Sequence, residues 1–115
     1  MMSILRQNET GEVLLSNLRE ANGFYSRFKG LMGKTTLQEG EGLRISPCNS
    51  IHCFFMRMNI DVLFLDEHHC VIHTIFDMKP WTMSKVIRGA KSVVEAESGV
   101  LRGKVKVGDC LSIDA

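Results

Sequence analysis

A chain of 115 residues, of which 44% are hydrophobic and 23% charged, predicts one folded domain spanning residues 1–115 rather than a disordered chain. The net charge of +1 argues against a nucleic-acid-binding protein, which usually carries a basic stripe. No apolar stretch approaches the roughly 20 residues that cross a bilayer, and the N-terminus is too polar for a signal peptide. The sequence therefore predicts a cytoplasmic protein with no nucleic-acid or membrane partner.

The N-terminal part of the chain predicts a β-hairpin followed by a helix. Strands are expected at residues 4–5 and 12–18, with a turn at residues 9–11. Between residues 24 and 32 apolar side chains recur at helical spacing, and Gly33 follows as a stop signal. We expect one short helix near residues 24–32.

Short strands with regular turn signals fill the rest of the chain. The expected strands cover residues 43–45, 60–65, 70–76 and 90–96, and residues 105–113 are expected to form short strands interrupted by a turn at Gly108-Asp109. Residues 60–65 carry apolar side chains at every position but one, which is typical of a strand buried on both faces. About seven short strands and one helix predict a mostly β, β-rich α+β fold, closed into a compact small barrel or sandwich.

Cysteine and histidine residues gather in two places, which raises the question of a metal site. Zinc is usually held by thiolates and imidazoles in pairs with C-x₂₋₄-C or H-x₃₋₅-H spacing. Cys48 and Cys53 are too far apart for the first pattern, although His69 and His73 fit the second. Adjacent residues of a strand also face opposite ways, so His52 and Cys53 could not share one ion. We therefore predict no bound metal and no cofactor.

The four cysteines could form two disulfides, but cytosolic redox buffers keep thiols reduced, so free thiols are expected. Cys53, Cys70 and Cys110 are interpreted as small hydrophobic residues of strands. Cys48 follows Pro47 at a strand exit and has a second interpretation as a nucleophile.

A Cys48 nucleophile would need His52 as its base and Asp61 to orient the imidazole ring. A cysteine and a histidine four residues apart often have no common role, and no oxyanion hole is evident from the sequence. Both interpretations stay open at this stage.

Aromatic and thioether side chains surround these polar groups. Phe55 and Met56 could line a ligand pocket together with Cys48, His52 and Trp81, because such pockets are mostly apolar with a few polar groups. Core packing explains Phe55 and Met56 equally well. Trp81 is the only tryptophan and lies in an expected loop, so it is the best single indication of a binding surface.

The remaining polar pattern is expected to be structural. Glu95 and Glu97 are interpreted as ordinary polar residues of a strand, and Gly108-Asp109 as a tight turn.

Several short blocks occur together in a fixed order along the chain. They are Arg27-x-x-Gly30-Leu31-Met32, Gly42-Leu43, Ser50-Ile51-His52, Phe54-Phe55-Met56, Ile60-Asp61-Val62, Phe64-Leu65-Asp66, Pro80-Trp81, Gly89-Ala90, residues 95–99 and Gly108-Asp109. From about residue 15 onward this pattern resembles the domain of unknown function 192 family. The resemblance implies a compact, mainly β domain and supplies no substrate, cofactor or catalytic set. Cys53 stands where a threonine is expected, which argues that Cys53 packs rather than reacts.

These observations favour a small cytoplasmic binding domain with a site around residues 47–61 and Trp81. The candidate binding residues are Cys48, His52, Met56, Asp61 and Trp81. The expected partner is a small-molecule ligand or another protein. The alternatives are a Cys48/His52 enzyme and a module that binds a partner through an exposed β-edge.

Overall fold

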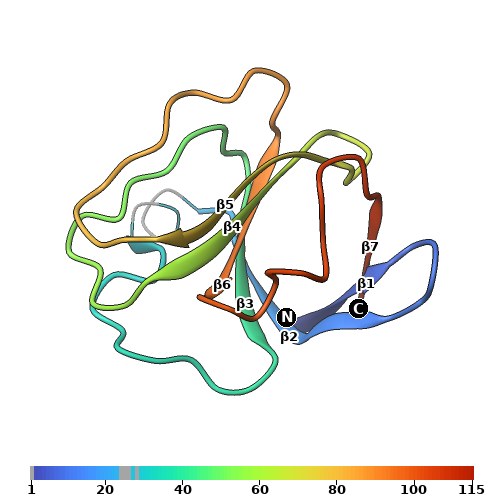
Figure 1. Cartoon of the computed structure of the whole chain (residues 1–115), viewed down its shortest axis with the longest axis horizontal. Coiled ribbons are helices and arrows are strands. Elements are labelled where there is room, and N and C mark those ends of the chain that lie inside the picture. Colours follow the sequence, from blue (N-terminus) through green and yellow to red (C-terminus); the bar gives the residue numbers. More distant parts are fainter. Residues whose placement is uncertain (1, 24–26, 28) are drawn as a thin grey trace.

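The computed structural model describes residues 2–23, 27 and 29–115, which form one curled seven-stranded sheet (Figure 1). The strands are β1 (Met2–Gln7), β2 (Val13–Ala21), β3 (Glu41–Ile45), β4 (Ile60–Leu65), β5 (Val71–Met78), β6 (Ser92–Glu97) and β7 (Leu111–Asp114). The predicted mostly β fold is confirmed. Within the described residues, no helix is long and apolar enough to cross a membrane.

The strand order is β5-β4-β6-β3-β2-β1-β7, and every neighbouring pair is antiparallel except β2 and β3. A parallel pair cannot be joined by a tight turn, so the chain needs a long crossover between these two strands. Residues 22–40 form this crossover. The β3–β4 and β5–β6 connections, green and orange in Figure 1, lie together on the left of the sheet.

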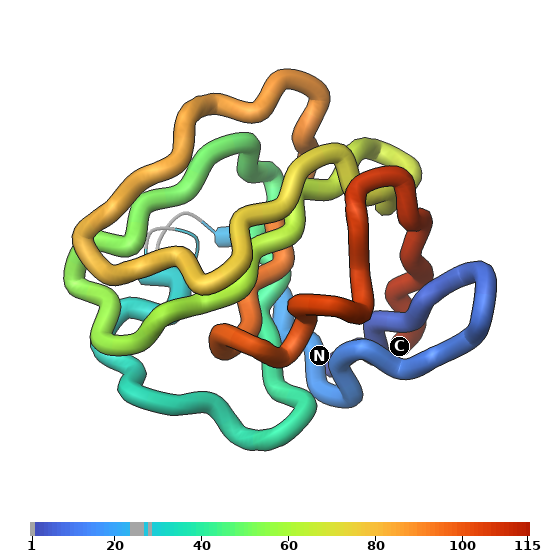
Figure 2. Tube along the Cα trace, in the orientation of Figure 1, coloured from blue at the N-terminus to red at the C-terminus, as the bar shows by residue number. Residues whose placement is uncertain are grey.

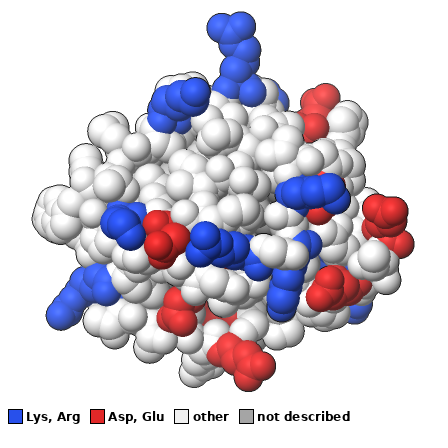
Figure 3. Space-filling model, viewed as in Figure 1, with Lys and Arg blue, Asp and Glu red and all other residues white. Residues whose placement is uncertain are grey.

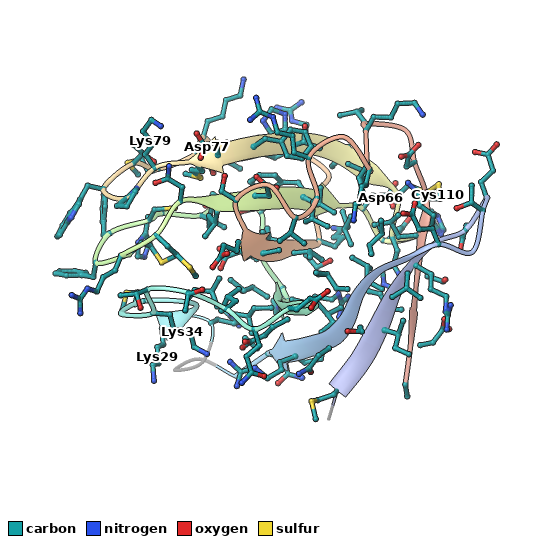
Figure 4. The ribbon with its side chains drawn as sticks, turned by 60° about the horizontal axis from the view of Figure 1, so that its bottom comes forward. Lys29, Lys34, Asp66, Asp77, Lys79 and Cys110 are labelled. Carbon is teal, nitrogen blue, oxygen red and sulfur yellow. A yellow bond between two sulfur atoms is a disulfide. The ribbon has the colours of Figure 1, made fainter. Side chains whose placement is uncertain are left out.

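The two ends of the curled sheet meet at a disulfide. Cys70 precedes β5, Cys110 precedes β7, and their sulfur atoms are bonded. The backbone pairs beside them, with Val71 N donating to Asp109 O at 2.7 Å and Leu111 N donating to His69 O at 3.0 Å. Figure 4 labels Cys110 at this junction. The prediction of four free thiols is therefore wrong for this pair, because the sheet curls far enough to bring two strand ends together.

Each central strand contributes to two hydrophobic cores. Ile60, Val62 and Phe64 of β4 enter a first core together with residues of the β3–β4 and β5–β6 connections. Leu63 and Leu65 enter a second core that residues 101–105 help to cover. All six residues of β4 are buried, as the sequence predicts.

Two predicted elements need correction or lie partly outside the described residues. Of the short strands expected on either side of Gly108-Asp109, the first, at residues 105–107, does not form, and β7 begins only at Leu111. The turn predicted at Gly108-Asp109 does form, and the Asp109 carboxylate holds it by accepting hydrogen bonds from Gln7 Nε2 at 2.9 Å and Lys106 N at 3.0 Å. In the predicted helix, residues 24–26 and 28 lie outside the described residues, Arg27 and Lys29 are helical, and residues 30–33 form turns.

Candidate functional site

A pocket of about 320 Å³ opens between the crossover, the β3–β4 connection and the face of the sheet that carries the first core. Three separate parts of the chain line it. The lining residues are Arg27, Lys29, Gly30, Leu31, Met32, Ile45, Pro47, Cys48, Asn49, Ser50, Ile51, His52, Met56 and Glu95.

The crossover covers the pocket by a close approach of its backbone. Leu31 is only 1% exposed and fixes the crossover in the first core. Gly30 has a left-handed φ of 51°, which glycine adopts without steric cost. A Cβ atom at Gly30 would lie 3.8 Å from Oε1 of Glu95, so the glycine backbone stands directly over this carboxyl group.

The β3–β4 connection forms a second wall because the β5–β6 connection runs beside it. Their backbones pair through Cys53 N to Thr82 O at 2.7 Å and Ser84 N to Ile51 O at 2.8 Å. Figure 2 shows the two connections, green and orange, following each other along one side of the molecule. This pairing holds residues 48–53 extended along the pocket without a helix or a sheet strand.

Glu95 is the most unusual side chain in the pocket. It is 4% exposed and lies in the centre of the sheet, paired with Leu43 of β3 and Val62 of β4. Burial raises the pKa of Glu95 from 4.5 to about 7. Among the described residues, no hydrogen-bond or ion-pair partner of its carboxyl group is found. The prediction that Glu95 is an ordinary polar strand residue is therefore wrong.

The sequence pattern of β6 itself indicates that Glu95 is buried. Val93 and Glu95 lie on one face of β6, and Val94 and Ala96 on the other. Since apolar residues occupy both faces of this strand, both faces are buried, and Glu95 has to be buried with them. An acidic residue inside such a strand is a better candidate than the polar residues of the loops.

Cys48 is a half-buried thiol and not an activated one. Its Sγ donates to Ser50 O at 3.0 Å. Burial raises the pKa of Cys48, and the Glu95 carboxylate raises it further. A backbone hydrogen bond from Ser50 and the positive charge of Arg27 lower it, but the net direction is upward. Cys48 therefore stays a protonated thiol at neutral pH, unlike a reactive cysteine.

His52 lies on the pocket wall and does not form the expected dyad with Cys48. Its Nδ1 accepts a hydrogen bond from Phe54 N at 3.3 Å, and its ring lies 5.0 Å from that of Phe54. Cys48 and His52, both among the described residues, share no hydrogen bond. The structure thus brings the two side chains to one pocket but not into the geometry of a nucleophile and its base.

Asp61 belongs to the architecture of the sheet. It is fully buried, and its Oδ2 accepts hydrogen bonds from the backbone N–H groups of residues 99, 101 and 102 at 3.0–3.1 Å. Its Oδ1 accepts a fourth from Asp77 N at 3.0 Å. With both oxygens engaged on the turn that follows β6, Asp61 neither lines the pocket nor orients His52.

Met56 and Trp81, the other two candidates, lie in different surroundings. Met56 is 5% exposed and lines the pocket as part of the first core. Trp81 is 62% exposed, does not line the pocket, and packs edge-on against Phe55 at 4.9 Å between ring centroids. Phe55 and Trp81 both adopt left-handed φ angles, of 64° and 66°, which are rare for bulky residues.

The charged side chains at the surface and the potential metal ligands do not form clusters among the described residues. Figure 3 shows basic and acidic side chains interspersed over the visible face, with no large area of one sign. In the part of the chain that the structure describes, no three His, Cys, Asp or Glu side chains gather as metal ligands would.

The DUF192 family model, described as "Uncharacterized ACR, COG1430", matches residues 5–113. The chain belongs to the DUF192 family. A UPF0127 protein of Pyrococcus furiosus is 34% identical over 105 residues, which cover 88% of this chain and 90% of that protein. A UPF0127 protein of Thermococcus sibiricus is 33% identical over 96 residues, covering 79% of this chain but only 61% of that protein.

Two solved structures share this DUF192 fold. A protein of unknown function from Novosphingobium aromaticivorans superposes with a TM-score of 0.82 at 18% identity, covering 97% of this chain and 84% of the other. A putative transcription regulator from Sinorhizobium meliloti gives a TM-score of 0.79 at 19% identity, covering 96% and 91%. At this level of identity, the likeness concerns the fold alone.

Several blocks that carry the DUF192 resemblance meet at the pocket. The Arg-x-x-Gly-Leu-Met block supplies Arg27 and residues 30–32, and the Ser-Ile-His block supplies residues 50–52. The region from residue 95 supplies the buried glutamate. By contrast, Asp61 serves the sheet, and Trp81 lies on the surface.

Proposed function

We propose that this DUF192 domain binds a small molecule in the pocket, with Glu95 as the polar contact at its inner end. The single observation behind the proposal is that the carboxyl group of Glu95, on an almost fully buried side chain, lines the pocket and has no hydrogen-bond or ion-pair partner among the described residues. Buried polar groups are nearly always hydrogen-bonded, and an exception requires an explanation. A ligand that donates a hydrogen bond to Glu95 provides one.

Of the residues predicted from the sequence, this proposal keeps Cys48, His52 and Met56 as wall residues. It adds Glu95 and gives Asp61 a structural role. Trp81 is left as an exposed surface residue outside the pocket, where it is available to a ligand or protein at the surface. The pocket lies at the lower end of the 300–1,000 Å³ range of ligand sites, which favours a small ligand.

The two alternative functions receive less support. An enzyme with Cys48 as nucleophile would need a lowered thiol pKa, whereas burial raises that of Cys48. A module that binds through a β-edge would need free strand edges, whereas the starts of edge strands β5 and β7 are joined by the Cys70–Cys110 disulfide.

The cytoplasmic location stays a prediction from the sequence. Disulfides are rare in the cytosol of mesophiles, but intracellular proteins of hyperthermophilic archaea contain many. Cells would be fractionated after acid quenching, and their free thiols alkylated. The fraction that contains the protein gives its compartment, and alkylation of Cys70 shows whether this cysteine is reduced. Cys70 fully reduced in the cytoplasm would support the location and contradict the disulfide under those conditions.

The proposed binding is tested by NMR with a library of small fragments and ¹⁵N-labelled protein. Binding in the pocket should shift the amide signals of Gly30, Cys48 and Ile51, while the signals of Leu101 and Val105 in the second core stay unchanged. Glu95→Gln should weaken the fragments that carry a hydrogen-bond donor. If no fragment shifts the pocket amides of the wild-type protein, the proposal is wrong.

A further inference from the structure

We propose that the ligand is a zwitterion of the α-amino-acid class with an apolar side chain, held by its ammonium group on Glu95 and by its carboxylate at Arg27 and Lys29. This inference rests on the proposed function and adds the chemical class of the ligand. Its basis is the arrangement of charge along one pocket, with an acidic group inside and basic groups at the opening.

The inner end of the pocket selects for a cationic donor. The apolar side chains of Ile45 and Met56 line the same pocket as Glu95 and offer it no hydrogen bond. A carboxylate removed from water is stabilised most by an opposite charge that also donates hydrogen bonds. A primary ammonium group satisfies both requirements and is small enough for the inner end.

The outer end carries the opposite charge. Arg27 is half-buried and Lys29 is exposed, and neither forms an ion pair with any described residue. Arg27 lies close enough to Cys48 to act on its thiol, as Glu95 does from within the pocket. Cys48 is therefore within electrostatic range of both the acidic and the basic groups. Arginine presents a planar pair of donors that matches a carboxylate.

The walls between the two ends are apolar and suit a hydrocarbon side chain. Leu31, Ile45, Ile51 and Met56 are all at least nine-tenths buried and line the pocket. Methionine side chains adapt to ligands of slightly different shape. A pocket of about 320 Å³ is large enough for a small zwitterion.

Ionisation of Glu95 links this binding to pH. An ammonium group binds the carboxylate and not the neutral acid, so affinity should rise as pH increases through about 7. A ligand that accepts a hydrogen bond from the neutral acid would show the opposite trend. The other titratable or charged groups that line the pocket or interact with Glu95 are Arg27, Lys29, Cys48, His52 and Cys53. They are the same in the wild type and in Glu95→Gln, so a difference in pH dependence between these two proteins comes from Glu95.

The test is isothermal titration calorimetry with the twenty standard amino acids, followed by leucine beside two analogues. 3-Methylbutylamine lacks the carboxylate of leucine, and 4-methylpentanoate lacks its ammonium group. We expect at least one apolar amino acid to bind about tenfold tighter than either matching analogue, because each analogue loses one charge-assisted contact. Affinity should increase about tenfold from pH 6 to pH 8.

Two variants assign the ends of the ligand. Glu95→Gln should weaken the amino acid about tenfold and abolish the pH dependence, while 4-methylpentanoate, an anion, should bind no more weakly than to the wild type. Arg27→Ala, which leaves Lys29 in place, should reduce the preference for leucine over 3-methylbutylamine several-fold, and Arg102→Ala, a matched change at an exposed arginine, should not.

Failure of this inference is distinguishable from failure of the proposed function. If all twenty amino acids fail to bind, or if an analogue binds as tightly as the amino acid, the ligand class is wrong. Fragments that still shift the pocket amides would then keep small-molecule binding and assign another ligand. Absence of any fragment binding would overturn both.

Discussion

Neutralising the buried carboxyl group should make the protein more stable at neutral and alkaline pH. The pKa of Glu95 rises from 4.5 to about 7 because the folded protein removes this group from water. Since one pKa unit is worth 1.36 kcal/mol, ionised Glu95 lowers the free energy of unfolding by about 3 kcal/mol. Glu95→Gln keeps the shape of the side chain and avoids this cost.

The direction of the pH dependence follows from linkage. The folded state holds the proton of Glu95 more tightly than the unfolded state does, so wild-type stability falls as pH rises from 4.5 to 7 and the loss is complete above 7. The gain in Glu95→Gln should therefore be less than about 1 kcal/mol at pH 5 and about 3 kcal/mol at pH 8. At pH 8 this corresponds to an increase in Tm of about 10 °C.

Urea unfolding followed by circular dichroism at both pH values measures these differences. Glu39→Gln is the control, because Glu39 is exposed and loses its charge in the same chemical change. The control should stay within about 0.5 kcal/mol of the wild type at both pH values. If Glu95→Gln gave an equal change at pH 5 and pH 8, or lowered stability at pH 8, Glu95 would have a stabilising partner and the reasoning would be wrong.

Four further predictions concern the rest of the fold and the predicted site. Replacing Cys70 and Cys110 by serine should lower the free energy of unfolding by up to about 4 kcal/mol, the loop-closure value for a separation of 40 residues, and an unchanged urea midpoint would contradict this. Asp61→Asn places an amide donor against backbone N–H groups and should lower stability by about 3 kcal/mol or more in the same assay, whereas a near-neutral result would refute its structural role. Cys48 should react with iodoacetamide at pH 7 more slowly than free cysteine, as followed by mass spectrometry. Faster reaction would support Cys48 as a nucleophile. Trp81→Ala should leave the affinity of pocket fragments within about twofold, and a larger loss in the NMR titration would place Trp81 in the site.

The fold was largely predictable because its signals are local. Residues 60–65 were assigned with the correct ends, since a run of apolar residues between turn signals specifies a strand buried on both faces. The short strand expected at residues 105–107 does not form because Leu101 and Val105 fold over the second core, where apolar residues need no strand. Hydrophobic alternation alone does not distinguish these two arrangements.

The site was less predictable because it depends on contacts between distant parts of the chain. Asp61 and Glu95 are both acidic residues within apolar strands, but one receives four backbone N–H groups and the other receives none from the described residues. This difference arises from the turn at residues 99–102, which lies about 40 positions after Asp61. The pairing of Cys70 with Cys110 likewise depends on the curl of the whole sheet.

A direct titration of the Glu95 carboxyl group tests the central claim. The protein would be labelled with ¹³C at the glutamate side-chain carboxyl position, with the Glu95 signal assigned by its absence in Glu95→Gln. NMR spectra between pH 4 and pH 9 should show a midpoint near 7, as expected of a buried carboxyl without a partner. A midpoint at or below 4.5 would show that the protein already stabilises the carboxylate, and the pocket would then lack the unsatisfied group on which ligand binding is argued.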